Sequence, residues 1–146
     1  MMKKFLVPVD GSEHSQKALE FACELAEKFA ATLLIIHVPQ GQLEDRVMVM
    51  GGASIMVHAD REALEQAGRA VLEAAQRIAE NAGVAAVSTE LVTGEPAEEI
   101  LKSAAGCAAD LIVIGSRGLG SFGSLVLGSV SNKVNHAAPC TCITVR

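Results

Sequence analysis

Short segments rich in apolar residues alternate along this chain with longer stretches in which apolar residues recur at helical spacing. The segment 32–38 (TLLIIHV) is apolar at nearly every position, which is typical of a strand buried on both faces of a parallel sheet. This alternation predicts one α/β domain, a three-layer α/β/α sandwich around a five-stranded parallel sheet. The expected strands are 5–9, 32–38, 86–92, 111–114 and 142–145, and the expected helices are 13–30, 59–81, 96–105 and 129–136.

The order of the strands decides where such a sheet binds a ligand. Two orders are common in doubly wound sheets, and five strands favour the flavodoxin-like order 2-1-3-4-5 or a relative of it. Ligands bind at the carboxyl ends of the strands, at the point where the order reverses. We therefore expect the site at the ends of the first and fourth strands, at Val9-Asp10 and Ile114-Gly115.

Residues 39–58 fit neither the strand pattern nor the helix pattern. They contain Gly41, Gly51 and Gly52 and a mixture of methionine and valine. A long stretch without regular structure is uncommon inside a compact domain unless it has a function. We expect a mobile excursion that acts as a lid or as a partner surface.

Charge and composition exclude several classes of function. The 146 residues carry a formal net charge of −5, whereas a general nucleic-acid-binding protein needs a broad basic face. The chain has no Trp or Tyr, so stacking on single-stranded bases is poorly supported. No apolar run reaches the length of a membrane span, and Pro8 interrupts the apolar start before it could form a signal peptide, so we expect a cytoplasmic protein. The cysteines form no C-x-x-C pair, which favours reduced thiols over a zinc site.

The fourth expected strand runs directly into a glycine-rich loop, and Gly128-Ser129 then begins the last expected helix. This order places backbone N–H groups at a helix N-terminus, where they can bind phosphate. Residues 111–146 contain no Asp or Glu and have a formal charge of +3, against −5 for the whole chain. In an acidic protein, the region without carboxylates is therefore the one shaped to bind an anion.

Three phosphate-loop patterns can be compared with this loop. The P-loop pattern G-x-x-x-x-G-K-[ST] fails because Ser129 stands where the pattern requires lysine. Residues 118–123 match G-x-G-x-x-G as a string, but they follow the fourth strand and no acidic residue comes after them to bind a ribose. The third pattern is glycine, two residues, glycine, nine residues, glycine and serine, which Gly115, Gly118 and Gly128-Ser129 match without adjustment.

The third pattern resembles the nucleotide-binding signature of the universal stress protein family. Residues 7–12 (VPVDGS), His37-Val38 and residues 138–145 (APCTCITV) are also similar to that family, so the resemblance covers essentially the whole chain. It implies the single-domain, ATP-binding branch, with an adenine nucleotide alpha hydrolase-like fold. It further implies bound ATP, ADP or AMP with Mg²⁺ held through the phosphates, a homodimer joined through the last strand, and an unknown regulatory protein partner.

Loop chemistry assigns roles to the residues of this pattern. Glycine at positions 115 and 118 lets the backbone approach a phosphate closely, and Gly128-Ser129 places free N–H groups at a helix N-terminus. Ser131 adds a second hydroxyl within the first turn. The expected nucleotide-binding residues are Pro8, Val9, Asp10, Val38, Ile114, Gly115, Arg117, Gly118, Gly128, Ser129, Val130 and Ser131.

Several of these assignments come from the resemblance alone. It places Pro8, Val9 and Val38 around the adenine, and Asp10 near the ribose and phosphates. Asp10 could instead be only a turn residue, although its position at a strand end favours a functional role. Arg117 lies between the glycines, where it could contact phosphate or remain a solvated charge.

No sequence feature indicates fast catalysis, and we expect neither catalytic nor metal-ligating residues. Phosphoryl transfer needs charge neutralisation and a positioned nucleophile, and Asp10 is the only carboxylate expected near the loop. The chain is therefore expected to be an ATP-binding stress-response regulator whose nucleotide occupancy controls partner interactions, with at most slow ATP hydrolysis. The alternatives are an interaction protein of the same fold without nucleotide, which the intact glycine pattern disfavours, and a flavin carrier, which the lack of Trp and Tyr disfavours.

Overall fold

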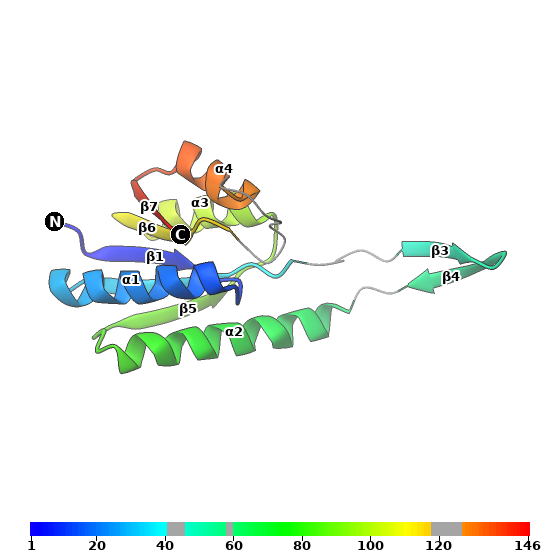
Figure 1. The fold of residues 1–146 in the computed structure, drawn as a ribbon, viewed down its shortest axis with the longest axis horizontal. Helices are drawn as coiled ribbons and strands as arrows, with labels where there is room; N and C mark the ends of the chain where they lie inside the picture. The colour runs from blue at the N-terminus through cyan, green and yellow to red at the C-terminus, as the bar shows by residue number, and fades with distance from the viewer. Residues whose placement is uncertain (41–45, 58–59, 118–126) are drawn as a thin grey trace.

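Within residues 1–40, 46–57, 60–117 and 127–146, which the computed structural model describes, five parallel strands form one sheet and four helices cover its two faces (Figure 1). Each expected strand and helix is present, with bounds that differ by at most two residues, so the three-layer α/β architecture is confirmed. The strands are β1 (Lys4–Pro8), β2 (Thr32–His37), β5 (Val87–Leu91), β6 (Leu111–Gly115) and β7 (Thr141–Val145), and the helices are α1 (Glu13–Phe29), α2 (Arg61–Asn81), α3 (Pro96–Gly106) and α4 (Ser129–Ala137).

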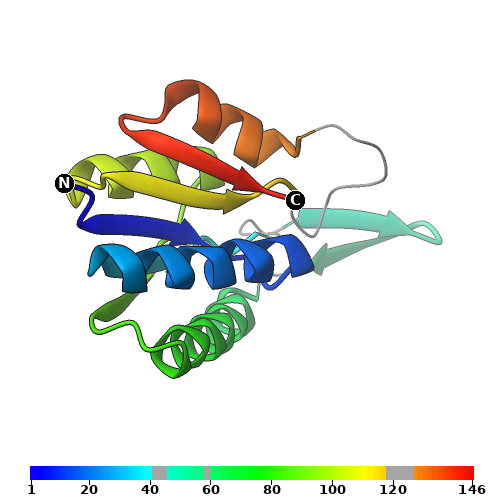
Figure 2. The same cartoon turned by 60° about the vertical axis from the view of Figure 1, so that its left-hand side comes forward.

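The strand order is β5-β2-β1-β6-β7, which becomes 3-2-1-4-5 when the strands are counted along the chain. The expected flavodoxin-like order 2-1-3-4-5 is therefore wrong. The reason is the face on which each helix packs: α1 and α2 share one core with the sheet, and α3 and α4 share the other (Figure 2). Parallel crossovers are right-handed, so strands joined by helices on the same face are added in one direction across the sheet. When the next helix lies on the other face, the following strand is added in the opposite direction. The reversal falls between β1 and β6, so the first and fourth strands are neighbours as expected.

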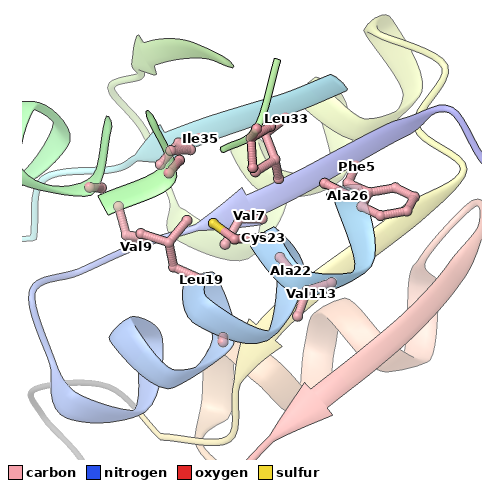
Figure 3. Close-up of a cluster of buried hydrophobic side chains, with 14 of the residues drawn as sticks. Phe5, Val7, Val9, Leu19, Ala22, Cys23, Ala26, Leu33, Ile35 and Val113 are labelled. Atoms are coloured by element: carbon pink, nitrogen blue, oxygen red, sulfur yellow. The ribbon is translucent and has the colours of Figure 1, made fainter. Parts of the chain in front are cut away.

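Alternate residues of β1 contribute to two hydrophobic cores. Phe5 and Val7 face α1, where they pack with Leu19 and Cys23 (Figure 3). Leu6 points to the opposite face and joins the core beneath α3 and α4. Full burial of such side chains contributes about 1.5–3 kcal/mol each, so β1 anchors both layers and fixes the position of its own carboxyl end.

Residues 46–57 form an antiparallel hairpin of β3 (Arg46–Met50) and β4 (Ala53–Val57), so the irregular excursion expected here is wrong over this stretch. Gly51 and Gly52 connect the strands with φ of +60° and +79°. Two central residues with positive φ are the requirement of a type I′ turn, which joins twisted antiparallel strands without splaying them. The hairpin extends away from the main sheet (Figure 1). The role expected for this stretch, as lid or partner surface, stays a prediction.

Two exclusions made from the sequence can be compared with the structure. All four cysteines are free thiols, and burial raises the pKa of the Cys23 and Cys142 thiols to about 11, so these two are protonated and unreactive at neutral pH. The described residues contain no group of His, Cys, Asp or Glu arranged to hold a metal ion. Among the helices that these residues form, none combines the length and the apolar character needed to cross a membrane.

Candidate functional site

A cleft opens at the carboxyl edge of the sheet, between the ends of β1, β2 and β6 and the first turns of α3 and α4. All the expected nucleotide-binding residues line this cleft except Gly118, which lies outside the described residues. The described lining residues are Pro8, Val9, Asp10, Ser15, Ile36, Val38, Gln40, Pro96, Ile100, Ile114, Gly115, Arg117, Gly128, Ser129, Val130 and Ser131.

Pro8 explains why the sheet opens at this point. The Lys4 carbonyl accepts the Asp110 N–H at 2.8 Å on the β6 side, and main-chain groups of a strand point to the same side at every second residue. Pro8 therefore faces β6 and has no N–H to donate. The pairing of β1 with β6 ends at Leu6 and Ile112. The two strands consequently part at their carboxyl ends, where the cleft lies.

Helix α4 presents an uncapped N-terminus to the cleft. Its N-cap residue is Gly128, and no side chain caps the helix, whereas α1, α2 and α3 are capped by Ser12, Asp60 and Glu95. The φ of −60° and ψ of 157° at Gly128 suit any residue, so the backbone does not require glycine here. The first-turn N–H groups have no acceptor within the helix and carry the positive end of its dipole. This end of α4 is therefore suited to an anion.

The Ser116 carbonyl joins the two ends of the glycine-rich segment. It accepts the Gly128 N–H at 2.6 Å and the Ser131 hydroxyl at 3.0 Å, while the Ser116 N–H donates to the Val145 carbonyl at 2.7 Å. These bonds hold the start of α4 against the end of β6. The Ser131 hydroxyl also lies 3.0 Å from the Gly128 carbonyl, so in this structure it stabilises the segment rather than pointing a donor into the cleft.

Packing of β6 against α1 requires glycine at position 115, and no sequence pattern indicated this contact. A Cβ atom at this position would lie 2.8 Å from the backbone carbon of His14 and 2.9 Å from the backbone nitrogen of Ser15. Both atoms belong to the first turn of α1, which cannot move aside as a flexible side chain can. The close approach of β6 to α1 therefore requires glycine, whatever binds in the cleft.

Asp10 serves as a turn residue and also lines the cleft. Its Oδ1 accepts the Ser12 N–H at 2.9 Å, and its own N–H donates to the Ser15 hydroxyl at 3.3 Å. These bonds fix the turn between β1 and α1. Asp10 is also the only carboxylate among the described lining residues, so the turn places a single acidic group in the cleft.

Two cations of the glycine-rich region have different surroundings. Arg117 lines the cleft. Lys133 instead lies 3.5 Å from the Glu95 carboxylate, where it bridges α4 to α3 at the surface. The Glu98 N–H and, secondarily, Lys133 hold the pKa of Glu95 below its usual value. Arg117 is thus the cation that the described residues offer to a ligand in the cleft.

Part of the cleft lining is apolar, and some of these residues were not expected from the sequence. Val9, Val38 and Ile114 were expected, whereas Ile36 and Ile100 were not. Ile36 lies two residues before Val38, so alternation along the expected strand 32–38 could have indicated it. Ile100 and the other unforeseen lining residue of α3, Pro96, come from a helix that the sequence places far from the glycine loop. Ser15 and Gln40 complete the unforeseen set.

No catalytic residues were expected from the sequence, but the structure brings Ser116 and His14 together beside the cleft. The Ser116 hydroxyl lies 3.4 Å from Nδ1 of His14, although the residues are 102 positions apart. This distance is long for a hydrogen bond from a hydroxyl. Ser116 is also buried and is not one of the described lining residues, so the pair does not constitute an activated nucleophile.

Comparison with known proteins identifies close relatives of this chain. A model of the Universal stress protein family matches residues 1–146. The chain is 38% identical to the universal stress protein YxiE of Bacillus subtilis over 149 residues, covering 100% of both chains. It is 39% identical over 146 residues, again 100% of both, to a universal stress protein from Thermus aquaticus encoded in the 3' region of a QAH/OAS sulfhydrylase.

A solved structure gives the same result for the fold. The universal stress protein from Archaeoglobus fulgidus in complex with dAMP superposes with a TM-score of 0.70 at 25% sequence identity. The superposition covers 100% of this chain and 98% of that one. The whole chain, rather than one segment of it, therefore shares the architecture of that protein.

Proposed function

This chain belongs to the universal stress protein family, and from that premise we propose that it binds an adenine nucleotide in the cleft between β1 and β6. The observation that carries the proposal is the uncapped first turn of α4, which lies in the same cleft as the apolar ends of β1 and β2. One end of the cleft suits phosphate and the other suits a base. The relative from Archaeoglobus fulgidus in complex with dAMP supports an adenine nucleotide as the ligand.

The lining residues divide between the parts of this ligand. Phosphates bind to the first-turn N–H groups of Ser129 and Val130 and to the Arg117 guanidinium, whereas the Gly128 N–H already donates to the Ser116 carbonyl. The adenine packs against Val9 and Val38 on one side of the cleft, with Asp10 near the ribose and phosphates. ATP at this site holds Mg²⁺ through its phosphates, since Asp10 alone supplies too few oxygen ligands for a protein-held ion.

A regulatory role fits this site better than catalysis. The described lining residues include one carboxylate and one cation, and no group among them is arranged to activate a nucleophile. ATP, ADP or AMP occupancy then controls binding to a regulatory protein partner in the cytoplasm during stress, with hydrolysis slow at most. Gly128, where the backbone does not require glycine, argues against the alternative of an interaction protein without nucleotide.

Nucleotide binding can be tested directly on the purified protein. We expect denaturation to release an adenine nucleotide, detected by anion-exchange chromatography of the supernatant, and Mg-ATP to raise the thermal unfolding midpoint of nucleotide-free protein. A yellow supernatant would indicate a flavin instead. Absence of both a released nucleotide and a thermal shift with ATP, ADP or AMP would refute the proposal.

The last strand provides the surface for the proposed homodimer. β7 is an edge of the sheet, and the Val145 carbonyl accepts the Ser116 N–H, so the main-chain groups of Val145 and Ile143 face β6. The main-chain groups of Thr144 and Cys142 alternate to the outer edge, where no described strand pairs with them. Such an edge can pair with a second copy of itself.

Light scattering should therefore report about twice the chain mass of 15.2 kDa at micromolar concentration. Thr144→Pro removes one outward N–H and should shift the protein to monomer, because proline is tolerated on an edge strand but cannot donate across it. Thr144→Ser keeps both the N–H and the hydroxyl that accepts from Asn135, so this control should remain dimeric. A parent protein that scatters as a monomer would contradict the interface.

A further inference from the structure

His37 lies at the end of β2, buried, next to the cleft but outside its described lining. Its Nδ1 is 2.7 Å from the carbonyl oxygen of Val9. Because a carbonyl oxygen only accepts, Nδ1 carries the proton in this bond and donates it. The imidazole therefore ties the end of β2 to the end of β1 at the place where Val9 lines the cleft.

A glycine in α2 makes the space for this ring. A Cβ atom on Gly68 would lie 2.9 Å from Cδ2 of His37 and 2.8 Å from Cδ1 of Leu91, which is closer than side chains approach one another. Helix α2 thus packs its backbone directly against the imidazole. This contact holds the ring in the orientation that directs Nδ1 to Val9.

The imidazole bond stands in place of a main-chain one. The Thr32 N–H donates to the Lys3 carbonyl at 2.8 Å, and parallel pairing of β1 with β2 repeats this contact at every second residue. Continued to the strand ends, the repeat brings the Val38 N–H to the Val9 carbonyl. Within the described residues this bond is not formed, and the carbonyl accepts from His37 instead.

Because His37 replaces Val38 as the donor to the Val9 carbonyl, the Val38 N–H is left as a main-chain donor at the wall of the cleft. Val38 lines the cleft and is only 6% exposed, and strand alternation directs its N–H toward the β1 side. Buried backbone N–H groups are nearly always paired, so an unused one beside a binding cleft is suited to a ligand acceptor. This donor comes from the end of β2, a different element from α4, whose first turn offers the other main-chain donors.

We propose that His37 is a positioning residue for the base of the nucleotide. By supplying the Val9 carbonyl with a donor and holding it in place, it leaves the Val38 N–H, which that carbonyl does not accept, for an acceptor nitrogen of the base, an inference that rests on the proposed function. Adenine presents such an acceptor, the unprotonated N1, beside its amino group, whereas the corresponding nitrogen of guanine carries a hydrogen. His37 therefore contributes to a preference for adenine over guanine.

The variant His37→Phe keeps a planar ring and removes the donor. The buried Val9 carbonyl then has no side-chain donor, so it turns to accept the Val38 N–H, and that N–H is no longer available to the ligand. We expect calorimetry to show ATP affinity reduced by about tenfold, the effect of one hydrogen bond, and the preference for ATP over GTP reduced by a similar factor. Affinity for inorganic tripolyphosphate, which has no base, should not change.

The variant His37→Asn supplies the rescue. Its amide can donate from about the position of Nδ1, so ATP affinity should return to within a few-fold of the parent. A purely structural role would weaken ATP and tripolyphosphate binding equally. Equal losses for the two ligands, or a His37→Phe variant that binds ATP like the parent, would overturn the inference and leave the proposed function in place.

A measurement without ligand tests the same geometry. Amide hydrogen exchange at Val38 should be fast in the nucleotide-free parent and slower in His37→Phe, because the variant forms the main-chain bond. Protection of the Val38 amide in the parent would contradict the inference that the His37 hydrogen bond replaces the main-chain bond between Val38 and Val9. A parent that exchanges as expected and yet binds neither ATP nor tripolyphosphate would refute the proposed function and, with it, the role of His37 toward a base.

Discussion

Replacing Gly128 with valine is expected to abolish adenine-nucleotide binding while leaving the fold intact. Gly128 is the N-cap of α4 and lines the cleft. A branched side chain here would fill the space through which a phosphate reaches the first-turn N–H groups. The φ of −60° and ψ of 157° suit valine, so the substitution adds little backbone strain. Isothermal titration calorimetry should detect no binding at Mg-ATP concentrations that saturate the parent.

Gly106→Val is the matched control for this experiment. Gly106 is an exposed residue at the end of α3, and apart from its chain neighbours and the adjacent backbone of its own helix, no atom lies within 4 Å of the position its Cβ would take. This control should bind ATP like the parent. Circular dichroism of Gly128→Val should match the parent spectrum. Unchanged ATP affinity in Gly128→Val would show that the phosphates do not lie at the start of α4.

Gly115→Ala is expected to act mainly on the free energy of unfolding, whereas Gly128→Val acts on nucleotide binding. The added Cβ would lie 2.8 Å from the backbone of His14, and neither β6 nor the first turn of α1 can move without disturbing the core. Overpacking of this kind costs about 1–3 kcal/mol in the free energy of unfolding. Urea denaturation should show the loss as a lower midpoint with an unchanged slope.

Gly106→Ala serves as the control for stability, since its Cβ meets no neighbour and its φ is not in the left-handed region. It should unfold at or above the parent midpoint. The contrary result for Gly115→Ala is a parent-like midpoint combined with weaker ATP binding. That outcome would mean that glycine is required at this position by the ligand, as the loop pattern alone suggested.

Much of the fold could be predicted because it depends on local pattern. The continuous apolar run 32–38 predicted a buried parallel strand, and Gly128-Ser129 predicted a helix start. The position of the cleft was also predictable, because carboxyl ends of parallel strands meet at one edge and Pro8 prevents β1 from pairing with β6 at that edge. The hairpin at 46–57 was missed, although Gly51-Gly52 between two apolar segments is a recognisable turn signal.

Strand order and several site details depended on contacts between distant segments. The sequence does not state which face of the sheet α2 covers, so it could not distinguish 3-2-1-4-5 from the favoured 2-1-3-4-5. Ile100 could not be assigned to the cleft until α3 was placed against α4. The clash of a Cβ at Gly115 with His14 joins residues about one hundred positions apart, and no spacing rule connects them.

The sequence by itself therefore determined the periodicities that create strands and helices, the glycine spacing of the loop, and the absence of acidic residues beyond position 110. These are properties of neighbouring residues, and elementary sterics and hydrogen bonding act on them locally. Only the tertiary structure decided that His37 binds the Val9 carbonyl and that Gly68 makes room for it. Those contacts exist because hydrophobic burial brings β1, β2 and α2 together. No local sequence pattern specifies which of their residues come into contact.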